Sequence, residues 1–206
     1  MILAILLAAA APAPMSAIDA ERAFAADAQR TGQWTAFRKW SAPRAMMFVP
    51  APTNAHQFLS PRKDPPQSVF WWPGRSYVSC DGNLAINTGP WVRGYGKTIG
   101  YFTTVWARQS DGGWKWVYDG GDELEFARDE GGDIKQVNAS CATPAPPHPA
   151  VETFGGDAVT QDGGSRDGSL RYFWQVAPDG KREFHAWLWD GAKMQPVIVD
   201  KIAAPQ

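Results

Sequence analysis

Seven Asp-Gly dipeptides punctuate this 206-residue chain beyond residue 80, and the segments between them are rich in Trp, Tyr, Val and Thr. Asp-Gly between alternating apolar segments is a strong local signal for a β-hairpin, because glycine readily adopts the positive φ of a tight turn. Aromatic residues make up 13% of the chain, and such rings either fill a core or line a cavity. Antiparallel β-structure is therefore predicted from about residue 68 onward.

Two hairpins are the clearest. Residues 101–108 and 114–118 flank Asp111-Gly112, and residues 170–176 and 183–189 flank Asp179-Gly180, followed through Asp190-Gly191 by a last strand near 194–201. A two-residue turn in each would pair Val105 with Tyr118 and His185 with Trp174. Alternation along the first hairpin then predicts one shared face, consisting of Tyr101, Thr103, Val105, Ala107, Trp114, Trp116 and Tyr118.

The chain before residue 68 is different in character. Apolar residues at spacings of three and four, interrupted by Gly32, predict two helices at roughly 18–31 and 33–41. Residues 42–67 are rich in proline, which predicts a loop with at most a short helix near 53–60. Residues 142–150 form a Pro-rich connector and residues 155–168 a Gly/Asp-rich loop. The length predicts one domain with a single core.

Residues 1–11 are uncharged and apolar, and prolines and small residues follow as far as Ala17. This pattern is typical of a secretory signal peptide over residues 1–17, although Lys and Arg are missing from its start; a buried first helix is the alternative. We expect a periplasmic or secreted protein that begins near Ile18 and keeps no membrane anchor after processing. Cys80 and Cys141 lie beside turn-forming residues. They form either a disulfide, as an oxidising compartment permits, or two separate thiols.

Charge and spacing exclude several classes of function. Lys and Arg total 20 against 21 Asp and Glu, so no basic surface for nucleic acid is predicted. The three histidines and two cysteines lack the spacing of a zinc site, and the acidic segment 119–133 lacks that of a calcium loop. The segment Gly94–Thr98 lacks the first glycine of a phosphate loop, because Trp91 stands there. No metal or cofactor is predicted.

The order of helices, a Pro-rich segment and an antiparallel sheet resembles the NTF2-like (SnoaL-like) superfamily, an α+β cone with N-terminal helices packed on a curved sheet. The segments Ala20–Phe24, Gly32–Phe37 and Ala45–Phe48 resemble its opening helices, and Leu84–Trp91, Gly100–Trp106 and Asp111–Asp119 resemble strands of its exported DUF4440-related members. The resemblance implies a core over residues 18–128. Residues 129–206 are then a connector and additional C-terminal β-hairpin strands, expected to join the same sheet.

This resemblance implies a cavity but leaves its chemistry open. The isomerases of the superfamily have a catalytic Tyr where this chain has Ala25 and a catalytic Asp where it has Val49, which disfavours their reaction. The leading hypothesis is a non-catalytic domain that holds a small apolar ligand, or contacts a partner. The residues expected to line the cavity are Phe24, Phe37, Trp40, Tyr101, Thr103, Trp114, Trp116 and Tyr118.

Three alternatives remain open at this point. One is an enzyme acting on a small hydrophobic substrate, with an acid or base from Asp27, Asp119, Asp122 or His185. Another is a structural homodimer in which a second subunit buries the aromatic face. In the last, the rings contact one another and leave no cavity, since protein interiors are normally close-packed.

Overall fold

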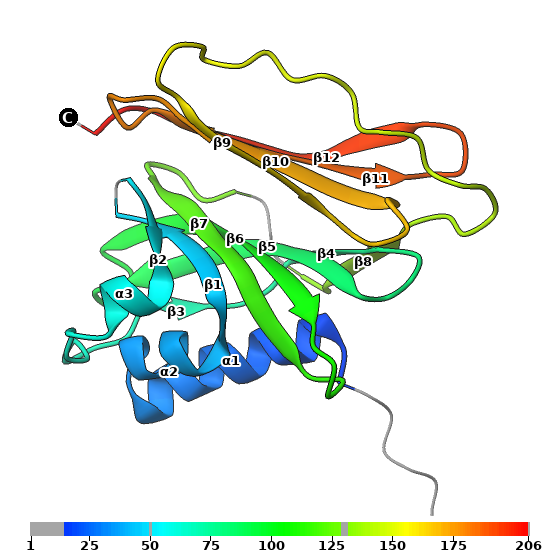
Figure 1. The fold of residues 1–206 in the computed structure, drawn as a ribbon. Helices are drawn as coiled ribbons and strands as arrows, with labels where there is room; N and C mark the ends of the chain where they lie inside the picture. The colour runs from blue at the N-terminus through cyan, green and yellow to red at the C-terminus, as the bar shows by residue number, and fades with distance from the viewer. Residues whose placement is uncertain (1–14, 50, 129–131, 206) are drawn as a thin grey trace, which may run out of the picture.

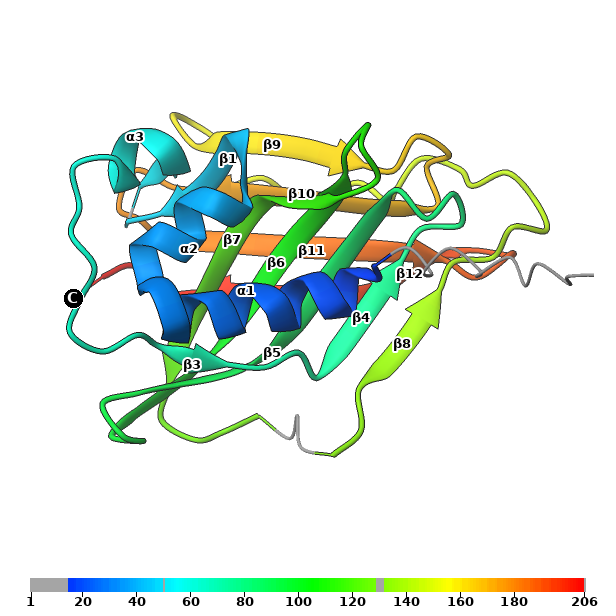
Figure 2. The same cartoon turned by 90° about the horizontal axis from the view of Figure 1, so that it is seen from below.

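The computed structural model describes residues 15–49, 51–128 and 132–205; most of the expected signal peptide, residues 1–14, lies outside them. The described residues form three helices, an eight-stranded sheet and a four-stranded sheet, arranged in layers (Figure 1). The helices cover one face of the larger sheet, and the smaller sheet covers the other face (Figure 2). The predicted α+β class is confirmed.

The two opening helices form where the sequence predicts them. Helix α1 (Ala17–Thr31) is capped by Ser16, whose side chain accepts a hydrogen bond from the Asp19 N–H, an arrangement that satisfies a free donor of the first turn. Gly32, with a φ of 106°, separates it from α2 (Gln33–Trp40). The Met15 carbonyl accepts a hydrogen bond from Trp114 Nε1. A mature chain beginning at Ile18 would lack both the cap and this contact.

The first sheet has the strand order β2-β1-β7-β6-β5-β4-β8, with β3 pairing to β5. Its strands are β1 (Ser41–Phe48), β2 (Pro52–Asn54), β3 (Phe70–Trp71), β4 (Arg75–Val78), β5 (Leu84–Arg93), β6 (Thr98–Arg108), β7 (Trp114–Leu124) and β8 (Lys135–Asn138). Neighbours are antiparallel except β1 with β7 and β4 with β8, which are parallel. The sheet is therefore mixed rather than antiparallel throughout.

The segment 42–67 departs from the sequence prediction. Strands β1 and β2 form where the sequence predicted a loop, and helix α3 (Ala55–Leu59) forms where it predicted a short helix. Ala45 and Met47 alternate as buried residues on β1, which is the period of a strand. The assignment of Ala45–Phe48 to an opening helix is thus wrong.

The second sheet contains β9 (Val159–Gly164), β10 (Leu170–Val176), β11 (Arg182–Trp189) and β12 (Met194–Ile202), all antiparallel. The prediction that the C-terminal strands extend the first sheet is wrong, because only β8 joins it. Apolar side chains of β10 and β11 instead pack face to face on the first sheet; Phe184, for example, lies 4.5 Å from Tyr118 between ring centroids. The described residues consequently contain two buried clusters, the helix-side core and the inter-sheet core, rather than one.

The Pro-rich connector crosses the outer face of the second sheet. His148 stacks on Trp187 with ring centroids 4.8 Å apart, and the Phe154 N–H donates a hydrogen bond to the Gln175 side chain. The predicted Gly/Asp-rich loop at 155–168 contains strand β9. Both faces of β10 and β11 are thereby covered, which explains why these strands carry large apolar residues at consecutive positions.

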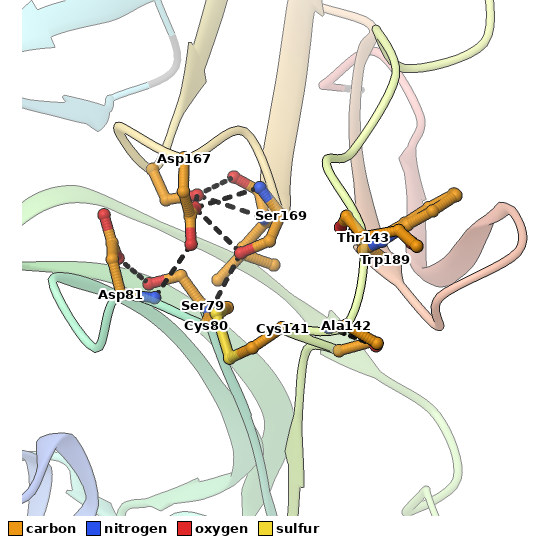
Figure 3. The surroundings of a disulfide bond; sticks show 12 residues. Ser79, Cys80, Asp81, Cys141, Ala142, Thr143, Asp167, Ser169 and Trp189 are labelled. Atoms are coloured by element: carbon orange, nitrogen blue, oxygen red, sulfur yellow. Dashed lines mark hydrogen bonds between the residues drawn. A yellow bond between two sulfur atoms is a disulfide. The ribbon is translucent and has the colours of Figure 1, made fainter.

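Cys80 and Cys141 form a disulfide, which confirms one of the two arrangements left open by the sequence (Figure 3). Their Cα atoms are 5.3 Å apart, and the bond joins the ends of the parallel strands β4 and β8. The Cys80 N–H donates to Ser169 Oγ, and the Asp81 N–H donates to Asp167. This junction therefore ties the first sheet to the turn that enters β10.

Candidate functional site

The hairpin turns differ from the two-residue turns predicted for them. The Gln109 N–H bonds to the Gly113 carbonyl, so Asp111-Gly112 ends a three-residue loop, and Ala177 and Lys181 close a loop of the same length around Asp179-Gly180. In each loop the last residue is a glycine at positive φ, as this turn class requires. His185 therefore lies opposite Phe173 instead of Trp174.

A bulge in β7 divides the predicted aromatic face. Val105 pairs with Tyr118 as expected, but Trp106 pairs with Trp116, so Val117 is an extra residue in the strand. One inserted residue reverses the side to which the neighbouring residues point. The prediction that Tyr101, Thr103, Trp114, Trp116 and Tyr118 share a face is wrong. Trp114 and Trp116 lie in the helix-side core, and Tyr118 lies in the inter-sheet core.

The aromatic rings beneath the helices fill most of the space there. Phe24 contacts Phe37, Trp40 and Trp106, and Trp116 contacts Phe37. Thr103 instead faces the second sheet, where its hydroxyl donates to Asp200 at 2.8 Å. The large aromatic residues of the central hairpin are buried within one chain, so the reason given by the sequence for a homodimer no longer holds; they are Tyr101, Trp114, Trp116 and Tyr118.

Space remains at one end of the first sheet, in a partly open cavity of about 350 Å³. Of the eight residues expected to line a cavity, only Phe37 and Tyr101 line this one. The full lining consists of Gln33, Phe37, Met47, Phe48, Val69, Trp71, Trp91, Tyr101, Phe102, Asp119, Gly120, Gly121, Asp122, Glu123 and Arg182. The cavity thus touches α2, five strands of the first sheet and, through Arg182, the second sheet.

Two consecutive glycines let the cavity reach past the edge of β7. Strand β1 pairs with β7 as far as the pair Met47–Asp119, and Gly120 and Gly121 follow. A Cβ on Gly121 would stand 2.0 Å from the Tyr101 carbonyl oxygen, so a larger residue cannot occupy this position without moving the backbone. Because neither glycine carries a side chain, Phe102 and Phe37 on the helix side share the cavity with Arg182 on the other side.

Asp119 is a half-buried carboxyl in the lining of this cavity. Burial raises the pKa of its carboxyl to about 7, and repulsion from the Glu21 carboxylate adds to the shift, while a hydrogen bond from Thr104 opposes it. The Thr104 hydroxyl donates to Asp119 Oδ2 at 3.2 Å. Asp119 was one of four candidate acids or bases in the sequence. The structure alone shows that it faces a cavity.

Glu21, which the sequence did not single out, lies on α1 and is fully buried. Its carboxyl accepts hydrogen bonds from Trp71 Nε1 at 2.9 Å, Trp106 Nε1 at 2.6 Å and Asn87 Nδ2 at 3.3 Å. Burial raises the pKa of Glu21 to about 7 despite these three donors. A Glu within an Ala-rich helix looks like a surface residue, and no local pattern distinguishes it from one.

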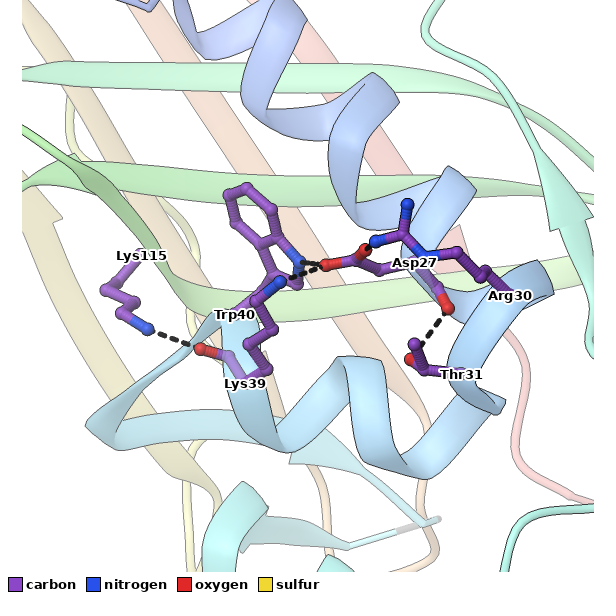
Figure 4. Close-up of polar contacts among 6 residues, drawn as sticks. All are labelled: Asp27, Arg30, Thr31, Lys39, Trp40 and Lys115. Atoms are coloured by element: carbon purple, nitrogen blue, oxygen red, sulfur yellow. Dashed lines mark hydrogen bonds and ion pairs between the residues drawn. The ribbon is translucent and has the colours of Figure 1, made fainter.

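Asp122 lines the cavity as well, whereas the two remaining candidates, Asp27 and His185, lie outside it. Asp27 accepts hydrogen bonds from Lys39 and Trp40 and pairs with Arg30, which fastens α1 to α2 (Figure 4). Burial alone would raise the pKa of Asp27, but the Lys39 and Trp40 hydrogen bonds and the Arg30 charge outweigh it and lower the pKa. His185 lies on the second sheet, 3.0 Å from Glu183, and does not line the cavity.

Stability should decrease as Asp119 and Glu21 ionise. Both have folded-state pKa values near 7, above their ordinary values of 3.8 and 4.5. The stabilisation that the two protonated carboxyls give the folded state is therefore fully present below about pH 4, and it is lost as the pH rises to about 7. Because Asn does not ionise, the free energy of unfolding of Asp119→Asn should rise relative to that of the natural protein when the pH is raised from about 4 to about 8. We expect this relative gain to be on the order of 2 to 4 kcal/mol. Urea unfolding at both pH values measures this, and a constant difference would contradict it.

Comparisons with known proteins add only a likeness of fold. No family model and no curated protein matches the chain. Similar solved structures include a protein provisionally described as a ketosteroid isomerase from Parabacteroides distasonis, with 15% identity, a TM-score of 0.43, and coverage of 53% of this chain and 89% of that one. An NTF2-like superfamily protein from Salmonella enterica has 14% identity, a TM-score of 0.40 and coverage of 56% and 94%.

The CaMKII hub of S. rosetta is also similar, with 21% identity, a TM-score of 0.39 and coverage of 54% of this chain and 100% of that one. Because all of these TM-scores are low, the likenesses carry no conclusion about activity, partners or assembly.

The described residues hold no helix long and apolar enough to cross a bilayer, and they bring together no group of three His, Cys, Asp or Glu suited to a metal ion.

Proposed function

We propose that this protein binds a small, largely apolar molecule in the cavity at the end of the first sheet, with Asp119 meeting a polar group of that molecule. The observation that carries the proposal is a cavity of about 350 Å³ that is lined largely by aromatic and apolar side chains, with a few ionisable ones, Asp119 among them. Small-molecule sites usually have this composition, an apolar lining with few polar groups.

A neutral aromatic probe such as 1-naphthylmethanol tests the proposal. Trp71 and Trp91 line the cavity, so intrinsic fluorescence should change saturably as the probe binds. Val69→Trp places a ring inside the cavity and should weaken binding about tenfold or more. Val159→Trp, the same substitution on an exposed residue of β9, is the matched control and should bind like the natural protein. No saturable response, or equal binding by both variants, would refute the proposal.

Proton transfer by Asp119 is the second candidate function. It is favoured by a pKa near neutrality, which suits a general acid or base. Ala25 and Val49, which occupy the isomerase positions, are absent from the cavity lining, so any acid–base chemistry here would use a different element of the fold. A binding protein should keep its affinity for the neutral probe in Asp119→Asn.

A further inference from the structure

Arg182 is a cation that reaches the cavity from the second sheet without an ion-pair partner among the described residues. Its Nη2 donates to the Gly121 carbonyl at 2.9 Å, and its guanidinium lies 5.6 Å from the Phe48 ring centroid. Its Nε is buried and has no hydrogen-bond partner among those residues. A buried donor left unpaired is costly, and more so when it is charged. The guanidinium, whose charge is met only by the Gly121 carbonyl among the described residues, can therefore take an anionic acceptor in the cavity.

Tyr101 lines the same cavity but does not offer a free hydroxyl to it. Its side chain is only 2% exposed, and its hydroxyl is buried where the Arg128 side chain interacts with it. Arg128 lies over the face of the Tyr101 ring, 3.3 Å from the centroid, but its own ion pair is with Asp200 at 3.0 Å. Arg182 is thus the one basic side chain in the lining of this cavity, and Arg128, the other nearby cation, is already paired.

From the Arg182 guanidinium, which has no ion-pair partner among the described residues, we infer that the cavity is built for a hydrophobic carboxylic acid. The ligand carboxylate would accept hydrogen bonds from Arg182, and its apolar body would lie against Phe37 and Phe102. Arginine suits this role because its planar guanidinium binds carboxylates through two parallel hydrogen bonds. The inference rests on the proposed function and specifies the ligand class of the same site.

Three acidic residues also line the cavity and must be weighed against this assignment. Glu123 is exposed and pairs with Arg93 at 3.4 Å, and an Asp122 oxygen accepts a hydrogen bond from the Glu123 N–H. Burial and the nearby Glu21 raise the pKa of Asp119 to about 7, which keeps it largely uncharged in mildly acidic solution. A cationic ligand would therefore rely chiefly on Asp122. Arg182, by contrast, places a positive charge in the same lining.

Three probes that share one apolar body separate these readings: 1-naphthylacetate, 1-naphthylacetamide and 1-naphthylethylamine. At about pH 6 we expect the carboxylate to bind about tenfold more tightly than the amide, and the amine to bind most weakly. Arg182→Gln retains a donor for the Gly121 carbonyl but removes the charge, and it should bring the carboxylate within about threefold of the amide. Arg182→Lys should keep much of the preference, because the charge remains.

The matched control is Lys181→Gln, which removes the same charge one residue earlier, from an exposed side chain that does not line this cavity. It should leave the carboxylate preference unchanged. Circular dichroism and thermal unfolding of each variant show whether it is folded.

Each outcome supports or overturns a distinct statement. Equal binding of all three probes, or tightest binding of the amine, overturns the carboxylate inference while the proposed function stands. If the carboxylate preference survives in Arg182→Gln, or disappears in Lys181→Gln, the preference arises from the overall charge of the protein. Either result also overturns the inference. If no probe binds, the proposed function itself fails.

Discussion

Replacing both cysteines of the Cys80–Cys141 disulfide with serine should lower the free energy of unfolding by about 4 kcal/mol. The bond closes a loop with a sequence separation of 61 residues, and the expected loss follows from the entropy that closing such a loop removes from the unfolded chain. Urea unfolding of the natural protein and of the double Ser variant gives the difference directly.

The position of the disulfide sharpens this expectation. Adjacent to it, Ser169 accepts from the Cys80 N–H and Asp167 from the Asp81 N–H, while Ser140 N–H donates to the Trp189 carbonyl. The bond therefore stands where both sheets are joined, and its loss should loosen the second sheet in particular. Reduction of the natural protein with a thiol reagent is the control and should give the same loss. A decrease below about 1 kcal/mol in both cases would contradict the loop-entropy argument.

Trp106→Phe should destabilise the protein more than Trp116→Phe, by about 1.5 to 3 kcal/mol, which is the usual contribution of a hydrogen bond to a charged group. The two tryptophans pair across β6 and β7, and both are fully buried in the helix-side core. They differ in one respect. Trp106 Nε1 donates to the Glu21 carboxyl at 2.6 Å, whereas Trp116 Nε1 has no partner among the described residues.

Each substitution removes the same atoms from a close-packed core, so the packing losses are similar and largely cancel in the comparison. Unfolding is best measured at about pH 8, where Glu21 is ionised, because burial places its pKa at about 7. In a Glu21→Gln background the difference between the two variants should shrink, since the charge on the acceptor is gone. Equal losses in the natural background would show that the buried carboxyl does not depend on the Trp106 donor.

Much of the secondary structure could be predicted from local sequence. Of the candidate site, only some of the residues could be predicted. Helix α1, helix α2 and the strands around the Asp-Gly dipeptides follow from periodicity and turn chemistry, which act over a few residues. Strand β1 could not be foreseen in this way. Its Pro-containing segment resembles a loop until pairing with β2 and β7 gives it partners.

The functional site shows the same division. Phe37, Tyr101 and Asp119 were candidates by residue type, whereas Arg182 and Glu21 carry no local signal of their roles. Which candidates meet depends on a single extra residue, Val117, because a bulge sends the side chains on either side of it to opposite faces of the sheet. No pattern in the sequence marks that bulge.

By itself, the sequence determined the helices, the hairpin positions and a pair of cysteines suited to a disulfide, since each depends on composition and spacing within a short segment. Only the tertiary structure decided that the C-terminal strands stack as a second sheet and that Arg182 reaches a cavity of the first. The physical reason is that these features depend on which apolar faces cover one another, and contacts between distant residues leave no mark in the local pattern of either segment.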